Sequence, residues 1–149
     1  MGVKRWHYFK QTVNGSSATD ASATHKLYID GKLGVSNTIN LSSRSASSVF
    51  AIGARTGGSV EIDAIISNLR YRSVLDDSLT VPTEPLTNVT NTKLLCCQSN
   101  TSATAAAVKP GTITANGNAA ATNFNPFNTD INTVRGQETG YPTWNPLTK

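Results

Sequence analysis

The two cysteines of the chain, Cys96 and Cys97, are adjacent in the stretch KLLCCQSN. Such a pair could form a strained vicinal disulfide, contribute to a metal site or act as a redox switch. The surrounding residues predict a short buried strand, on which successive side chains point to opposite faces. A metal would need further soft ligands, and the sequence offers none beside the pair. We therefore expect two free thiols that pack as small hydrophobic groups.

The histidines are the next candidates for chemistry. His7 and His25 have no Asp-Ser or Cys partner at a spacing that nucleophilic catalysis uses, so each is expected to be an ordinary strand residue. The patterns of a nucleophile elbow, a phosphate-binding loop and a dinucleotide-binding turn are absent from the sequence. We expect no catalytic residue, no cofactor and no metal, and hence a protein that is not an enzyme.

Composition excludes several function classes. The 149 residues carry a formal net charge of +4, but only 15% of them are charged and the basic residues are scattered. Without a basic cluster we expect no nucleic-acid partner. No apolar run approaches the roughly 18 residues of a membrane span, so no membrane insertion is expected. The basic start is not followed by an apolar stretch, so a signal peptide is not expected either.

The first hundred residues predict short strands separated by turns. Ser, Thr and Asn, which favour strands and turns over helices, make up about a third of the chain. Strands are expected at 5–13, 25–30, 32–36, 47–54, 60–72 and 93–99. The Asp30-Gly31 pair between two of them is a strong hairpin signal. Residues 73–92 are expected to form a long connection with one short helical turn at 74–79. This spacing of turns is typical of a β-sandwich or barrel.

The composition changes near residue 100. We expect a domain at 1–100 and an extended, low-complexity arm at 101–149 with a short strand at 112–115. The arm has few hydrophobic residues with which to build a core of its own. Its four large aromatic residues are therefore expected to dock against neighbouring subunits as an assembly interface: Phe124, Phe127, Tyr141 and Trp144.

Several stretches resemble one family of sandwich domains. Residues 5–36 contain a Trp-His strand and a Leu-Tyr-Ile-Asp-Gly hairpin, and residues 49–75 contain Ile-Gly and Ile-Ser-Asn-Leu-Arg strands. These resemble laminin G-like, concanavalin A-like domains. The segments PLTNVTNTKLLCCQSN and INTVRGQETGYPTWNPL resemble the ends of such domains in virion proteins of marine tailed phages, especially cyanophages. The resemblance implies a partial concanavalin A-like antiparallel β-sandwich, or jelly roll, with the C-terminal arm attached.

The family resemblance also raises expectations that the sequence does not meet. Sandwich glycosidases of this class use a Glu-x-Asp-x-(x)-Glu strand, and here Glu61 and Asp63 are followed by Ile65 and Ile66 where the last acid belongs. The retaining mechanism needs two carboxyl groups about 5 Å apart, so one of its acids is missing. Many relatives place a calcium-binding Asp where this chain has Ser67 or Asn68. We therefore expect neither glycosidase activity nor a calcium site.

The resemblance covers the later part of the family domain, whose usual opening strands have no counterpart here. A half-sandwich exposes long edges and one apolar face, which favours an obligate partner. The sequence thus predicts a non-enzymatic virion protein of a tail fibre, the tail or the capsid surface, assembled in the host cytoplasm. Its expected partners are other virion proteins, copies of itself and host surface glycans at loops 14–24 and 55–59. The alternatives are a stand-alone carbohydrate-binding module, an inactive glycosidase relative, or a fragment of a larger fibre gene.

Overall fold

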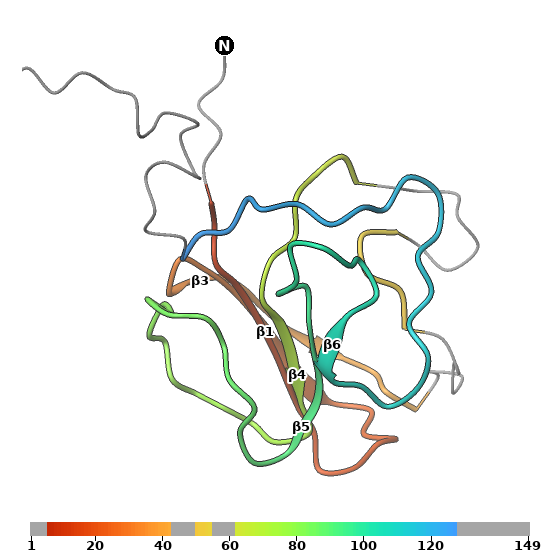
Figure 1. Cartoon of the computed structure of the whole chain (residues 1–149). Coiled ribbons are helices and arrows are strands. Elements are labelled where there is room, and N and C mark those ends of the chain that lie inside the picture. Colours follow the sequence, from red (N-terminus) through yellow and green to blue (C-terminus); the bar gives the residue numbers. More distant parts are fainter. Residues whose placement is uncertain (1–5, 43–49, 55–61, 128–149) are drawn as a thin grey trace, which may run out of the picture.

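A computed structural model describes residues 6–42, 50–54 and 62–127 of the chain. These residues contain no helix, and hence no helix that could cross a membrane. Their strands form two antiparallel sheets of three strands each (Figure 1): β1 (Phe9–Asn14), β2 (Ala23–Ile29), β3 (Lys32–Ile39), β4 (Leu69–Arg72), β5 (Thr92–Cys96) and β6 (Ala106–Val108). The expected all-β class is confirmed, and the two antiparallel sheets are compatible with a β-sandwich.

The first sheet has the order β1-β2-β3 and is built around the expected hairpin. Ile29 pairs with Lys32, so Asp30 and Gly31 form a two-residue turn. Both turn residues have positive φ, 51° and 78°, which is the backbone that a type I′ hairpin turn requires and that Asp-Gly favours. A register shift at Leu27/Tyr28 marks a bulge in the pairing of β2 with β3.

The second sheet has the order β4-β5-β6, with β5 in the centre. Leu94, Leu95 and Cys96 of β5 are buried, so the expected returning strand is confirmed. It ends at Cys96 because the backbone of Cys97 turns to a φ of 61°. Strand β6 lies within residues 101–149 and still pairs with β5, so the second sheet extends past residue 100 into the segment expected as an arm.

Three expected elements differ from the structure. Of the expected strand at 60–72, the described residues 62–72 contain only β4, because Asn68 adopts a left-handed φ of 56° directly before it, and residues 60–61 lie outside the described residues. The expected strand at 112–115 is absent, and the short strand lies at 106–108, where β5 offers a pairing edge. Of the expected strand at 47–54, residues 50–54 contain only a single bridge at Ala54, and 47–49 lie outside the described residues.

The expected helical turn at 74–79 is also wrong. Side chains in this segment bind the backbone two residues further on, which competes with helical hydrogen bonds. The Ser78 amide donates to Asp76 Oδ1 at 3.0 Å, and the Thr80 amide donates to the Ser78 hydroxyl at 3.4 Å. The segment therefore runs as an irregular connection along the first sheet.

The hydrophobic core of the described residues is small. Its buried members are Ala23, Tyr28, Leu94, Leu95 and Cys96. In Figure 1, β4 and β5 lie over β1, and Lys10 of β1 reaches the connection that follows β4. Much of the large hydrophobic surface is thus left outside the core.

Candidate functional site

The two faces of the first sheet differ in chemistry. Residues paired directly across antiparallel strands share a face, and Phe9 pairs with Ile29 while Leu27 pairs with Val35. One face therefore carries most of the sheet's large apolar side chains, and we call it the apolar face: Phe9, Val13, Leu27, Ile29, Val35 and Ile39. The same register also places Gln11, His25, Lys32 and Asn37 on this face. The opposite face is mostly polar, and we call it the polar face: Lys10, Thr12, Asn14, Thr24, Lys26, Tyr28, Leu33, Ser36 and Thr38. The alternating sequence HKLYID predicts Leu27 and Ile29 on one face and Lys26 and Tyr28 on the other, and the pairing confirms this.

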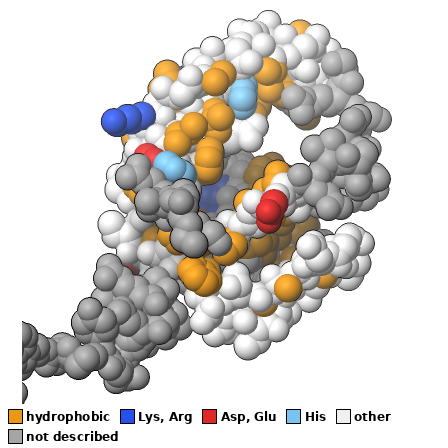
Figure 2. Space-filling view, turned by 90° about the horizontal axis from the view of Figure 1, so that it is seen from above, with side chains coloured by type: hydrophobic (Ala, Val, Ile, Leu, Met, Phe, Trp, Pro, Cys, Tyr) orange, Lys and Arg blue, Asp and Glu red, His pale blue; other side chains and the backbone are white. Residues whose placement is uncertain are grey.

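The apolar face is open to solvent. Phe9 is 63% exposed, and Val13, Ile29 and Val35 are each more than a third exposed. Figure 2, a view from above, shows that hydrophobic side chains are also exposed around a hollow with a Lys or Arg side chain in its depth. Several large apolar side chains exposed on one face of a sheet make that face a candidate interaction site. Both β1 and β3 are edge strands of the sheet, so the apolar face is bordered by two strand edges.

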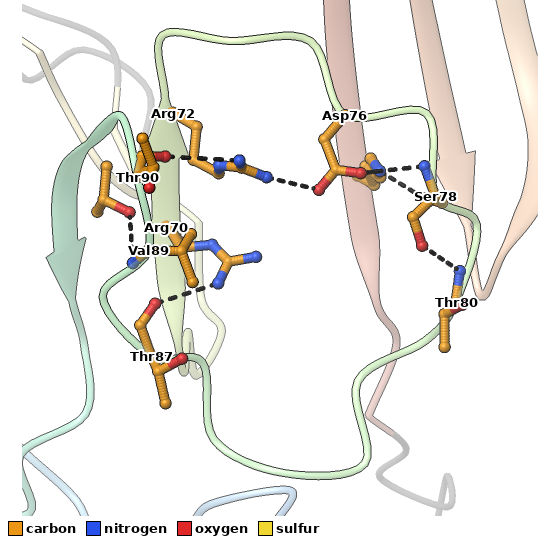
Figure 3. Close-up of polar contacts among 10 residues, drawn as sticks. Arg70, Arg72, Asp76, Ser78, Thr80, Thr87, Val89 and Thr90 are labelled. Carbon is orange, nitrogen blue, oxygen red and sulfur yellow. Dashed lines mark hydrogen bonds and ion pairs between the residues drawn. The ribbon is translucent and has the colours of Figure 1, made fainter.

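The polar face meets the rest of the chain through charged groups. Asp76 lies between the two sheets, 3.3 Å from Lys10 Nζ of β1 and 2.9 Å from Arg72 Nη1 of β4 (Figure 3). The amide hydrogen bond from Ser78, the charge and hydrogen bond of Lys10, and the nearby Arg72 hold the pKa of Asp76 below its usual value, although partial burial acts in the opposite direction. We call Lys10, Asp76 and Arg72 the charged bridge.

The arginines of β4 also hold the returning connection in place. Arg70 donates to the carbonyl oxygen of Thr87 at 3.1 Å, and Arg72 donates to that of Thr90 at 3.5 Å (Figure 3). The side chain of Tyr8 lies near Arg70 and Asp76, and burial raises its pKa despite the positive charge of Arg70. Charged and polar groups thus occupy the space between the sheets that a sandwich normally fills with hydrophobic residues. This arrangement orients the polar face inwards and leaves the apolar face outside.

A second exposed apolar group lies on the other sheet. The rings of Phe50 and Tyr71 stack with their centroids 6.4 Å apart, and both residues are more than half exposed. Ile62 and Ile66 pack near Gly53 in the same part of the chain, and they too are exposed. Each sheet therefore leaves hydrophobic side chains uncovered.

Asn68 is a buried polar residue at the point where three segments meet. Its Oδ1 accepts hydrogen bonds from the Leu86 amide at 3.2 Å and from Gln98 Nε2 at 2.8 Å. The backbone N–H of Asn68 donates to the carbonyl oxygen of Cys97 at 2.9 Å. Gln98 Nε2 also donates to the carbonyl oxygen of Leu86 at 2.7 Å. We call Asn68, Leu86, Cys97 and Gln98 the Asn68 junction. Sequence reasoning considered Asn68 only as a departure from a calcium ligand and missed this structural role.

The cysteine side chains were expected to face away from each other, and this is wrong. Cys97 has a left-handed φ of 61°, so it does not continue the alternation of β5, and its Sγ lies 3.6 Å from the Sγ of Cys96. Both cysteines are free thiols, as expected; Cys96 is buried and Cys97 is half-buried. The hydrogen bond between them, together with burial, raises the pKa of Cys96, and the same hydrogen bond lowers the pKa of Cys97 to about 7.

The aromatic residues expected to form an assembly interface are only partly described. Phe124 is 46% exposed, and its amide donates to the Thr122 hydroxyl at 3.2 Å. Phe127 is half-buried, with its amide bound to Asn125 Oδ1 at 2.9 Å. Tyr141 and Trp144 lie outside the described residues. The assembly interface of four aromatic side chains therefore remains a prediction.

The remaining candidate groups have local roles where they are described. His25 Nδ1 lies 2.8 Å from Asn37 Oδ1 across β2 and β3, and His7 Nδ1 lies 2.8 Å from Asp30 Oδ2 beside the hairpin turn. His25 is a strand residue as expected, whereas His7 precedes β1. Asp63 is exposed outside any strand, and Glu61 lies outside the described residues. Within the described ranges, no three His, Cys, Asp or Glu side chains come together as metal ligands.

The loop at 14–24, expected to face outwards, is organised by one carboxylate. Asp20 accepts hydrogen bonds from the amides of Ser16 and Ser22, each at 2.7 Å, and from the Ser16 hydroxyl. These bonds lower the pKa of Asp20, and the loop offers hydroxyl groups rather than aromatic rings to solvent. The other expected outward loop, 55–59, lies outside the described residues.

A hollow of about 160 Å³ lies between β1, β2 and the connection after β4. Its volume is smaller than that of an ordinary ligand pocket.

Comparison of the chain with protein-family models, with curated proteins and with solved structures finds no match.

Proposed function

We propose that this chain is a non-enzymatic structural protein of a phage virion, placed in a tail fibre, the tail or the capsid surface. Its partial concanavalin A-like sandwich is completed when a neighbouring subunit covers the apolar face, and its C-terminal arm fastens it to the particle. Another copy of this chain is the first partner, and other virion proteins are further partners. The observation that carries the proposal is the open apolar face of the first sheet, with Phe9 63% exposed.

Physical chemistry supports assembly. Burying apolar surface contributes roughly 25 cal/mol per Å², so leaving a strand-lined apolar face in water forgoes stabilisation that a partner can supply. The core of the described residues is small, so the free energy gained by burying this face is a larger fraction of the total stability. The exposed Phe50–Tyr71 pair and Phe124 add further hydrophobic contacts that a subunit interface can use.

The virion setting is supported by the resemblance of residues 85–100 and 131–147 to the ends of cyanophage virion domains. The resemblance also assigns contact with host glycans to the outer loops. Loop 14–24 would make such contact through the hydroxyl groups of its serines and threonines.

The decisive experiment is quantitative mass spectrometry of purified phage particles whose genome encodes the chain. Between roughly six and eighteen copies per particle would match closed cyclic symmetry of a tail or fibre, and hundreds would match capsid decoration. Absence from the particles would refute the virion function and leave a stand-alone sugar-binding protein as the better alternative.

A second experiment tests the assembly face itself. Light scattering on the reduced full-length chain should show an oligomer that dissociates at least about tenfold more readily in a Phe9→Ser or Val35→Ser variant, because each loses a large exposed apolar contact. The matched control is Leu33→Ser, since Leu33 is 55% exposed on the same sheet but pairs with Tyr28 on the opposite face. A monomeric wild type, or equal effects of all three variants, would refute self-assembly through this face.

A further inference from the structure

The cysteine pair has a geometry that neither strand packing nor the proposed assembly requires. The two sulfur atoms lie 3.6 Å apart, so they would have to approach by about 1.6 Å to reach the roughly 2.0 Å length of a disulfide bond. On an extended strand, adjacent side chains point in opposite directions. The left-handed φ of 61° at Cys97 removes that divergence and turns its thiol towards that of Cys96.

The backbone that brings the thiols together is held by the Asn68 junction. The Cys97 carbonyl accepts the Asn68 amide hydrogen bond at 2.9 Å, and the next residue, Gln98, binds both Asn68 Oδ1 and the Leu86 carbonyl. Asn68 itself has a left-handed φ of 56°, so two non-glycine residues in a costly conformation face each other. Such conformations cost about 1–3 kcal/mol each and persist where the surroundings enforce them. The reduced protein thus already holds the turn that brings the two sulfur atoms together.

We propose that Cys96 and Cys97 form a reversible dithiol–disulfide couple that exchanges with small-molecule disulfides. Cys97 is the attacking residue, because it is half-buried and accessible whereas Cys96 is buried. Its thiolate attacks one sulfur of the small disulfide, forms a mixed disulfide and expels one small thiolate. Cys96 then releases its proton to solvent and attacks the Cys97 sulfur, which forms the vicinal disulfide and expels the second small thiolate. Two protein thiols are oxidised, and one small disulfide is reduced to two thiols.

The electrostatics of the pair fit this order of attack. When Cys97 is deprotonated, the Cys96 S–H can donate to its thiolate across 3.6 Å, and this hydrogen bond lowers the pKa of Cys97 to about 7. A thiol with a pKa near the ambient pH is the most effective attacking group in exchange. Once Cys97 is capped, its negative charge is gone, so the hydrogen bond that raised the pKa of Cys96 is weakened. Cys96 then becomes the resolving thiol.

The bond formed in this way is expected to be reversible. Adjacent Cα atoms across a trans peptide lie about 3.8 Å apart, below the range of about 4.4–6.8 Å in ordinary disulfides. The resulting strain makes the bond easier to reduce than a structural disulfide. Closing the remaining gap between the sulfur atoms is expected to shift the Cys97 backbone, whose carbonyl accepts the Asn68 hydrogen bond. The redox state is therefore coupled to the junction that holds residues 68, 86 and 98 together.

Intact-mass spectrometry of the full-length chain tests the proposal, and the chain contains only these two cysteines. The reduced protein is incubated with oxidised glutathione and sampled over time. The wild type should lose the mass of two hydrogen atoms without retaining glutathione, and dithiothreitol should restore it. The Cys96→Ser variant should retain one glutathione on Cys97. The Cys97→Ser variant should react at least about tenfold more slowly, because its remaining thiol is buried.

Three outcomes would overturn the proposal. They are a wild type that retains glutathione, a wild type that does not react, and disulfide formation only between two chains. Alkylation of the folded wild type by iodoacetamide provides a second measurement that does not depend on the serine variants folding. Its rate should rise with a midpoint near pH 7, set by Cys97. A midpoint at the ordinary thiol value of about 8.5 would contradict the assigned attacking residue.

Discussion

The charged bridge between the two sheets can be tested by removing Asp76. The Asp76→Ala variant lacks the carboxylate that contacts Lys10 at 3.3 Å, Arg72 at 2.9 Å and the Ser78 amide at 3.0 Å. The side chains of Lys10, Arg72 and Asp76 are 12%, 24% and 32% exposed, so the bridge is neither fully buried nor on the open surface.

The expected cost follows from that intermediate position. Exposed ion pairs contribute about 0.2–1 kcal/mol, and removing one partner of a buried pair costs about 3–5 kcal/mol. For two partly buried pairs and one amide hydrogen bond, we expect the free energy of unfolding to fall by about 2 kcal/mol. In the double-mutant cycle with Lys10→Met, the coupling between Lys10 and Asp76 should be about 1 kcal/mol.

Urea unfolding of the reduced full-length chain, followed by far-ultraviolet circular dichroism, measures this change. Asp77→Ala is the matched control, because Asp77 is an exposed neighbour of the same type. Its substitution should change the free energy of unfolding by less than about 0.5 kcal/mol. Equal unfolding midpoints for the Asp76→Ala and Asp77→Ala variants would refute the idea that the bridge holds the two sheets together.

Three further predictions concern pH, the hairpin turn and the Asn68 junction. The pKa of Asp76 is lowered in the folded state, so the stabilisation that its carboxylate provides should be complete above the unfolded pKa of about 3.9. This stabilisation should be lost as the pH falls through the folded pKa. In urea titrations at acid pH, the unfolding free energies of the wild type and Asp76→Asn should therefore converge. Gly31→Ala should lower stability by about 2 kcal/mol or more, since φ is 78° and the new Cβ would lie 2.8 Å from the Leu79 carbonyl oxygen; thermal melts that match the wild type would contradict this. Asn68→Ala should be less stable than Asn68→Gly by about 1 kcal/mol, because both lose the bond from Leu86 but only alanine resists the left-handed backbone.

Local sequence patterns identified the elements whose causes are local. The Asp30-Gly31 hairpin follows from two adjacent residues that tolerate positive φ, and the faces of β2 follow from strict alternation. The apolar character of KLLCC correctly predicted the buried strand β5. The predicted strand at 60–72 was too long because Asn68 can continue a strand or break it, and distant hydrogen-bond partners decide which. Those partners, Leu86 and Gln98, are 18 and 30 residues away.

The sequence by itself determined the all-β class, the main hairpin and the central buried strand. Only the tertiary structure decided which face of the first sheet points outwards. The alternation of side chains along β1–β3 is the same whichever face is covered. Which face is covered depends on the contact between Lys10 and Asp76, which are 66 residues apart in the sequence. The meeting of the two thiols is also tertiary. A strand pattern predicts that Cys96 and Cys97 diverge, and the Asn68 junction turns the backbone so that they meet.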